Sequence, residues 1–115
     1  MLHEYDWYYS PLLATRELLE VKIDYLDRLW ACRWQWCTVW NNGHRKQYVR
    51  RTGYANGRDI SLYLHREILK RHIPIPPDYR HIMVDHINGD TFDCRMENLR
   101  WATPRMNALN ISRKR

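Results

Sequence analysis

The residues best suited to chemistry lie between positions 85 and 107. Asp85 and His86 are adjacent, and Asn98 and Asn107 follow at spacings that a hairpin and a helix can bring back to that pair. A carboxylate and an amide oxygen are hard ligands that suit Mg²⁺ or Mn²⁺. A neighbouring neutral imidazole can take a proton from water near pH 7. Together the four side chains indicate metal-assisted hydrolysis of a phosphodiester.

Each of these residues has a role that its chemistry favours. If Asp85 and His86 end a strand and Asn107 begins the next helix, Asp85 and Asn107 would supply two oxygens to one divalent metal ion. His86 would activate the attacking water, and Asn98 suits hydrogen bonds to the loop backbone or to His86. An Asp-His pair alone is more often an ordinary turn, so the complete set carries the interpretation. His65 is either a second functional imidazole or, as we favour, a structural one at a helix start.

A strand–loop–strand–helix unit is needed to hold these side chains. The sequence predicts a strand at 82–86, a loop that contains Gly89, and a second strand at 99–102. Thr103-Pro104 then supplies an N-cap and a first-turn proline for the last helix. The unit is therefore predicted as ββα.

Upstream of this unit the sequence predicts a three-stranded antiparallel meander and a helix. Large residues alternate over 30–40, and strand signals recur at 46–52 and 59–64. The tryptophans of the first strand share one face, which favours core packing over a base-stacking platform. Helical spacing over 65–72 follows, and the predicted fold class is α+β.

The first part of the chain is predicted as an N-terminal arm or short helix over 1–20. Ser10-Pro11 suits a helix start, and the helix would run to Glu20. A brief strand at 21–24 follows, and Asp24 is expected to cap a helical turn that ends at Leu29.

Charge divides the chain into two parts. Residues 1–28 carry three basic and six acidic side chains, whereas residues 29–115 carry sixteen basic and seven acidic ones, so the net charges are −3 and +9. A cationic body favours a nucleic-acid partner, although a solvated basic surface is the alternative. Strands can present arginine to phosphates and guanine edges, and arginines beside the site can clamp phosphate. The predicted DNA contacts are Arg45, Lys46, Arg50, Arg51, Arg58, Arg100 and Arg105.

Cysteine count and hydropathy indicate where in the cell the protein is expected. Cys32, Cys37 and Cys94 form no CxxC pair, which disfavours a disulfide framework and leaves structural zinc as a weak alternative. No apolar run approaches the roughly 20 residues that cross a bilayer. We therefore expect an intracellular protein without a membrane partner.

The motif VDHINGD, followed by ENLRWAT and a later asparagine, resembles the HNH endonucleases and their ββα-metal fold. The resemblance implies that His86 is the general base, that Asp85 and Asn107 hold one Mg²⁺ or Mn²⁺ ion, and that Asn98 braces the loop. The lead-in from residue 21 is similar to that of phage and intron-encoded homing-type members, whose meander resembles an AP2-type DNA-binding sheet.

The resemblance implies a metal-dependent DNA endonuclease in the cytoplasm of a bacterial or phage-infected host cell. One site per chain favours nicking by a monomer or weak dimer. The predicted organisation is an arm at 1–20, a DNA-gripping sheet and helix at 21–72, and a nuclease unit at 73–115. Two alternatives remain at this stage, namely a non-catalytic DNA-binding module and a phage structural or interaction domain that retains the fold.

Overall fold

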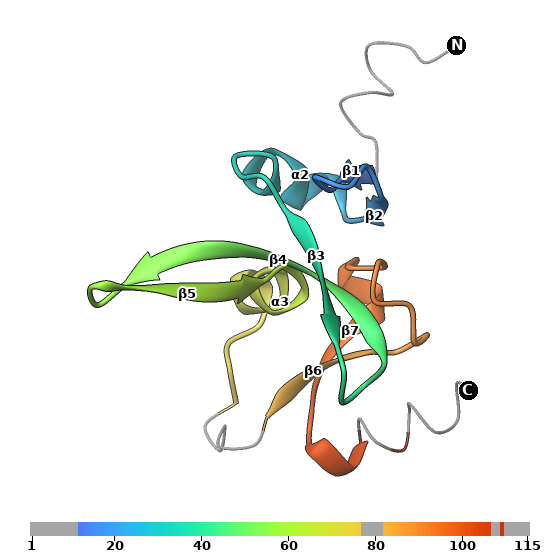
Figure 1. Cartoon of the computed structure of the whole chain (residues 1–115). Helices are drawn as coiled ribbons and strands as arrows, with labels where there is room; N and C mark the ends of the chain where they lie inside the picture. The colour runs from blue at the N-terminus through green and yellow to red at the C-terminus, as the bar shows by residue number, and fades with distance from the viewer. Residues whose placement is uncertain (1–11, 77–81, 107–108, 110–115) are drawn as a thin grey trace, which may run out of the picture.

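The structure is a computed structural model that describes residues 12–76, 82–106 and 109. Within these residues it has three antiparallel sheets, with strand orders β1-β2, β3-β4-β5 and β6-β7. The predicted α+β class is confirmed, since a three-stranded sheet and a helix precede a two-stranded hairpin (Figure 1). No helix in the described ranges is long and apolar enough to cross a membrane. The elements are β1 (Leu12–Ala14), β2 (Glu20–Lys22), α2 (Tyr25–Ala31), β3 (Cys37–Asn41), β4 (Lys46–Ala55), β5 (Arg58–Tyr63), α3 (Leu64–His72), β6 (Met83–His86), η1 (Met96–Asn98) and β7 (Leu99–Ala102).

The predicted helix over 10–20 is wrong within the described residues, because β1 and β2 form a hairpin there. Leu13 and Val21 are cross-strand partners, and both are buried. The backbone N–H of Thr15 donates to Leu19 O, and its hydroxyl accepts from Leu19 N, which closes the turn. Burying alternate side chains against the body outweighs the local helix signal. Ser10 and Pro11 lie outside the described residues.

The predicted strand over 30–40 is wrong in its first half. Trp30 lies in α2, and Trp34 and Trp36 lie in the connection to β3. The helix begins after Asp24 as expected, but it runs to Ala31, and the Asp24 carboxylate accepts from Met96 N instead of capping it.

Trp36 is buried and donates from its indole Nε1 to Ala31 O. The rings of Trp30, Trp34 and Trp36 lie 5.4–6.3 Å apart, and Trp30 and Trp34 pack partly buried against the core that contains Trp36. Core packing is wrong for Trp40, which lies on β3 and is 55% exposed. Large residues at alternate positions also occur where a helix ends and a tight turn follows. The sequence pattern alone does not distinguish this arrangement from a strand.

The meander β3-β4-β5 forms as predicted, with a longer central strand. β4 and β5 pair in register from Arg50↔Tyr63 to Ala55↔Arg58 and project away from the body as a hairpin (Figure 1). The turn at its end uses Asn56 and Gly57, whose φ values of 54° and 79° suit asparagine and glycine.

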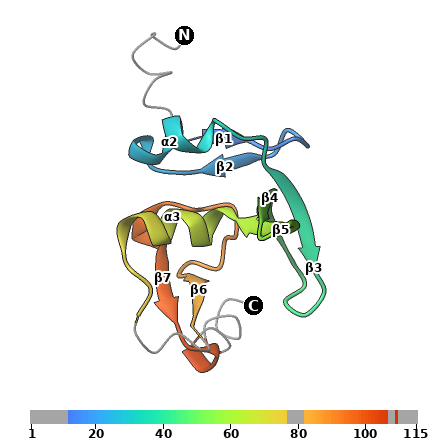
Figure 2. The ribbon, with the colours of Figure 1, turned by 90° about the vertical axis from the view of Figure 1, so that its left-hand side faces the viewer.

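Helix α3 lies between two layers of the molecule. In Figure 2 the β1-β2 hairpin and α2 cover one side of it, and β6 and β7 lie on the other. The buried face of α3 is made by Leu64, Ile68 and Leu69, as its spacing predicts. At its C-terminal end, the buried carboxylate of Asp27 accepts a 2.7 Å hydrogen bond from His72 and pairs with Arg71. These contacts fix α2 against α3.

The N-terminal layer is also joined to the loop between β6 and β7. Lys22 of β2 donates its N–H to Phe92 O and accepts from Cys94 N, which forms a parallel bridge. One hydrophobic core includes Val21 of β2, Val49 of β4 and Leu99 of β7, so residues from all three sheets stabilise the same interior.

Candidate active site

Asp85 and His86 occupy the end of β6. The register pairs Asp85 with Arg100 and His86 with Leu99 of β7, and the two side chains are 2% and 5% exposed. Arg100 Nε donates to Asp85 Oδ2 at 2.9 Å. A carboxylate and an imidazole therefore follow one another at the end of a short hairpin, with a guanidinium against the carboxylate.

Asn98 ties together the loop that follows. Its Oδ1 accepts from the backbone N–H of Asn88 at 2.8 Å, and its Nδ2 donates to Asp93 O at 2.9 Å. The backbone N–H of Ile87 also donates to Asn98 O. These are loop-backbone hydrogen bonds of the kind the sequence predicts for this asparagine, while its part in catalysis stays a prediction.

Other polar side chains of the loop fix its shape further. Asp93 is buried and accepts from Arg95 through both carboxylate oxygens, at 2.8 and 2.7 Å. The Arg95 hydrogen bond is the main reason that the pKa of Asp93 lies below its ordinary value. Asn88 Nδ2 donates to the same carboxylate, and Asp90 Oδ1 accepts from Phe92 N. The loop holds its form through side chains rather than regular backbone pairing.

The helix after β7 begins where the sequence places it. Residues 104–106 are helical, and the Thr103 hydroxyl accepts from Met106 N at 3.2 Å. Asn107, the predicted second metal ligand, lies outside the described residues, so its place in the site stays a prediction.

His86 belongs to a cluster of rings that comes from three elements. Its ring centroid lies 4.7 Å from that of His65 at the start of α3 and 6.0 Å from that of Tyr48 on β4. Tyr48 in turn lies 5.5 Å from His65, and its hydroxyl hydrogen-bonds His44 Nδ1 at 2.9 Å. The sequence motif around Asp85 and His86 does not show that Tyr48 and His65, from distant parts of the chain, pack against His86.

Burial keeps both central imidazoles neutral. Desolvation lowers the pKa of His86 to about 4; the nearby charge of Asp85 opposes this shift and that of Lys46 adds to it. Burial first, and the neighbouring His86 second, hold the pKa of His65 well below its ordinary range. A neutral imidazole at pH 7 has a lone pair that can accept a proton.

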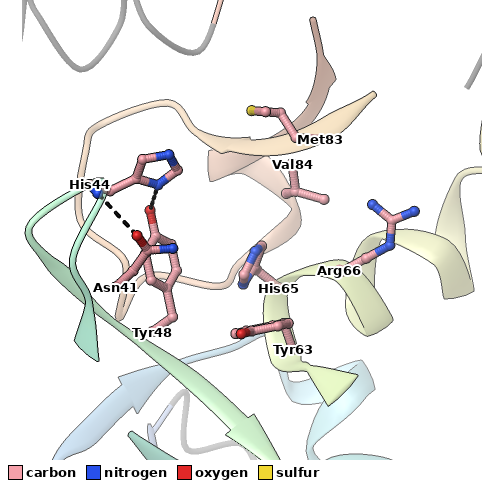
Figure 3. A pocket seen from close by; sticks show the side chains of 8 residues that line it. All are labelled: Asn41, His44, Tyr48, Tyr63, His65, Arg66, Met83 and Val84. Atoms are coloured by element: carbon pink, nitrogen blue, oxygen red, sulfur yellow. Dashed lines mark hydrogen bonds between the residues drawn. The ribbon is translucent and has the colours of Figure 1, made fainter. Parts of the chain in front are cut away.

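A pocket of about 230 Å³ opens beside this cluster (Figure 3). The sequence predicts none of its residues as a ligand site. Turn chemistry near residue 43 indicates a hairpin there, but its place against α3 and β6 depends on tertiary packing. The lining residues are Asn41, His44, Tyr48, Tyr63, His65, Arg66, Met83 and Val84.

The basic residues predicted to touch DNA occupy different environments. Lys46 Nζ donates to Gly89 O at 2.8 Å, which places it against the loop after β6. The guanidinium of Arg51 lies 4.0 Å from the Trp34 ring centroid, whereas Arg50, on the opposite face of β4, donates to Thr52. The other predicted DNA contacts are exposed, namely Arg45, Arg58, Arg100 and Arg105.

The described residues contain no group of three or more histidine, cysteine, aspartate or glutamate side chains placed to hold a metal ion. Asp85 is the described member of the predicted ligand pair. Its donor atoms are hard carboxylate oxygens, which fit Mg²⁺ or Mn²⁺ and do not favour a soft metal.

A known family matches the second part of the chain. Residues 62–109 match the family model described as HNH endonuclease, which confirms the resemblance over α3, β6, η1 and β7. No curated protein and no solved structure matches the chain. Two finer resemblances stay predictions. One is that the meander resembles an AP2-type sheet, and the other is that the chain is similar to phage or intron-encoded members of the family.

Proposed function

From the HNH endonuclease match of residues 62–109, we propose that this chain is a metal-dependent DNA endonuclease that hydrolyses phosphodiester bonds. The observation that carries the proposal is His86, a buried neutral imidazole beside Asp85 at the end of β6 within the matched segment. In this proposal His86 is the general base that takes a proton from the attacking water.

Asp85 and Asn107 are the proposed ligands of one Mg²⁺ or Mn²⁺ ion. When bound, such an ion stabilises the negative charge that develops on the phosphate and on the leaving oxygen. Two protein oxygens leave coordination positions for water and for phosphate oxygens. Arg100 holds the Asp85 carboxylate through its Nε and brings a positive charge next to the site.

Asn98 is the proposed positioning residue of the site. Its hydrogen bonds to the backbone of Asn88 and Asp93 keep the loop closed behind His86. A base must lie within hydrogen-bond reach of its proton donor, so a fixed loop supports catalysis without touching substrate.

The meander is the proposed DNA-gripping surface. Arg45 and Arg58 are exposed at opposite ends of the sheet, and Tyr54 is 74% exposed near the far end of the β4–β5 hairpin. Exposed arginine and aromatic side chains on a β-ribbon suit contacts with phosphates and groove edges. One site per chain favours nicking by a monomer or weak dimer.

A supercoiled-plasmid assay with Mg²⁺ or Mn²⁺ tests the proposal. We expect the wild type to convert supercoiled DNA to the nicked form, a chelator to stop the reaction, and His86→Ala to lose it. His72→Ala is a matched control, because this imidazole pairs with Asp27 and is outside the ring cluster. Circular dichroism checks that each variant is folded.

Two results would change the assignment. Equal cleavage by wild type and His86→Ala would remove His86 as the base. DNA binding without cleavage under either metal would instead identify a non-catalytic DNA-binding module.

A further inference from the structure

The pocket beside the ring cluster has the size and lining of a site for one planar, polar group. Its volume of about 230 Å³ is far below what a duplex would need. Three aromatic side chains, Tyr48, Tyr63 and His65, contribute to its walls (Figure 3). Aromatic faces that line a small space are the feature by which proteins hold an unstacked base.

Two of the rings that line the pocket also lie next to His86. His65 and Tyr48 both line the pocket, and both also contact His86, at centroid distances of 4.7 and 6.0 Å. A DNA strand whose phosphate lies at His86 would therefore bring a flanking nucleotide to the pocket.

Polar groups are available at several places around the walls. Asn41 and His44 form one side, where the Asn41 Oδ1 accepts from the His44 N–H and the His44 ring bonds the Tyr48 hydroxyl. Arg66 adds a positive charge, with its guanidinium 5.3 Å from the Trp101 ring. Amide, imidazole and guanidinium groups can read the hydrogen-bonding edge of a base.

His65 is hard to explain as a packing residue alone. Its Nδ1 is buried and has no hydrogen-bond partner among the described residues. Burying an unpaired polar atom is unfavourable, and an apolar ring would fill the same space without that cost. A polar ring at this position is consistent with a wall that contacts a polar ligand.

We propose that this pocket receives one unstacked base of the DNA, from the nucleotide that flanks the cleaved phosphodiester. The inference rests on the proposed nuclease function and adds a subsite to it. Placing the base here fixes the strand relative to His86 through stacking on aromatic faces, which tolerates more than one base identity.

A double-mutant cycle on the cleavage rate tests the subsite, with one change in the protein and the other in the DNA. The cut position is first mapped on plasmid DNA, and duplexes are then made with an abasic analogue at each nucleotide near it. We expect one abasic position to slow wild-type cleavage about tenfold, as loss of one stacked base predicts. His44→Ala should slow cleavage of the intact duplex by a similar factor, and the abasic change should add nothing further to it.

Matched variants separate the pocket from the surrounding turn. Asn41→Ala, also in the pocket, should repeat the His44→Ala result, so that the test does not depend on one variant. Asn42→Ala changes the neighbouring residue of the same turn, which does not line the pocket, and should retain the full abasic effect. Circular dichroism confirms that all three are folded.

Two outcomes overturn the subsite while the nuclease assignment stands. The first is that no abasic position slows cleavage by the wild type. The second is that, at every position, the abasic site slows His44→Ala by the same factor as it slows the wild type. Absence of cleavage by the wild type in every arm would remove the proposed function itself, and this inference with it.

Discussion

The loop that carries the proposed active site and the tip of the β4–β5 hairpin are held in different ways. The site loop, residues 87–98, is crossed by hydrogen bonds from Asn88, Asp93 and Asn98 side chains. The hairpin tip, residues 54–59, has ladder pairing and a two-residue turn with positive φ. Its large side chain Tyr54 is 74% exposed.

This difference matches what each region is proposed to do. A site that places a base against a phosphate must keep its geometry, because small misplacements are costly in rate. A surface that follows the DNA backbone gains from exposed and adaptable side chains. The site loop is therefore expected to respond strongly to truncation in stability and activity, and the tip mainly in DNA affinity.

Removing the Asn98 amide is expected to have the largest effect. In Asn98→Ala the Asp93 carbonyl loses its partner in a buried setting and the Asn88 N–H loses its partner in a part-buried one, which should together cost about 2 kcal/mol of unfolding free energy. Cleavage should fall as well, because the loop behind His86 loosens. Urea unfolding and the plasmid assay measure the two effects.

Asn56→Gly at the hairpin tip is the control for that experiment. Asn56 has a φ of 54°, a conformation that glycine also adopts readily, so its stability should stay within about 0.5 kcal/mol of wild type. A similar loss for both variants would contradict the contrast between the loop and the tip.

The pH dependence of stability should come next in size, with His86 as its main expected source. The pKa of His86 is lowered to about 4 in the folded protein, whereas the unfolded chain takes up this proton near pH 6.5. Stability from the neutral imidazole is thus present above pH 6.5 and is lost as the pH falls below it. Between pH 7 and pH 5 we expect a loss of roughly 2 kcal/mol from His86, with His65 acting in the same direction.

Urea unfolding at the two pH values, with a chelator present, checks this expectation. His86→Gln should reduce the loss by roughly 2 kcal/mol. Tyr54→Phe at the tip should leave it unchanged. Equal pH dependence in wild type and His86→Gln would mean that the imidazole takes up its proton as easily in the folded protein as in the unfolded chain.

Much of the fold was predictable because its signals are local. The strand signals of β4 and β5, the helical spacing of α3 and the Thr103 cap act within a few residues, and the structure has each of them. The two errors in secondary structure arise where tertiary burial decides the conformation. Leu13 and Val21 pair as strand neighbours under the core, and Trp36 turns inward to bond Ala31.

The site was predictable only as far as its linear motif extends. Asp85, His86 and Asn98 lie close together because one hairpin and one loop connect them. His44, Tyr48 and His65 reach the same place from other elements, and no spacing in the sequence reports that contact. The neutral state of His86 depends on this packing too, since burial is its main cause.

Arg51 and Arg58 are both predicted as DNA contacts from the sequence, but Arg51 packs over tryptophan rings and Arg58 is exposed at the hairpin tip. Arg51→Ala should cost about 1 kcal/mol of unfolding free energy, because its guanidinium and stem pack over the rings of Trp34 and Trp36. DNA affinity should change little. Thermal unfolding and fluorescence anisotropy separate the two effects, and a stable variant with weak DNA binding would show that Arg51 contacts the nucleic acid instead.

Arg58→Ala should have the smallest effect on the folded protein and the clearest effect on the salt dependence of binding. The residue is exposed beside the turn at the hairpin tip, so the unfolding free energy should stay within about 0.5 kcal/mol of wild type. Loss of one phosphate contact reduces the slope of log affinity against log salt by about one. An unchanged slope would place the tip away from the DNA, and the grip would then have to come from residues nearer the site loop, such as Arg45. A reduced slope with unchanged stability would show that the exposed tip contributes to binding while the braced loop determines cleavage.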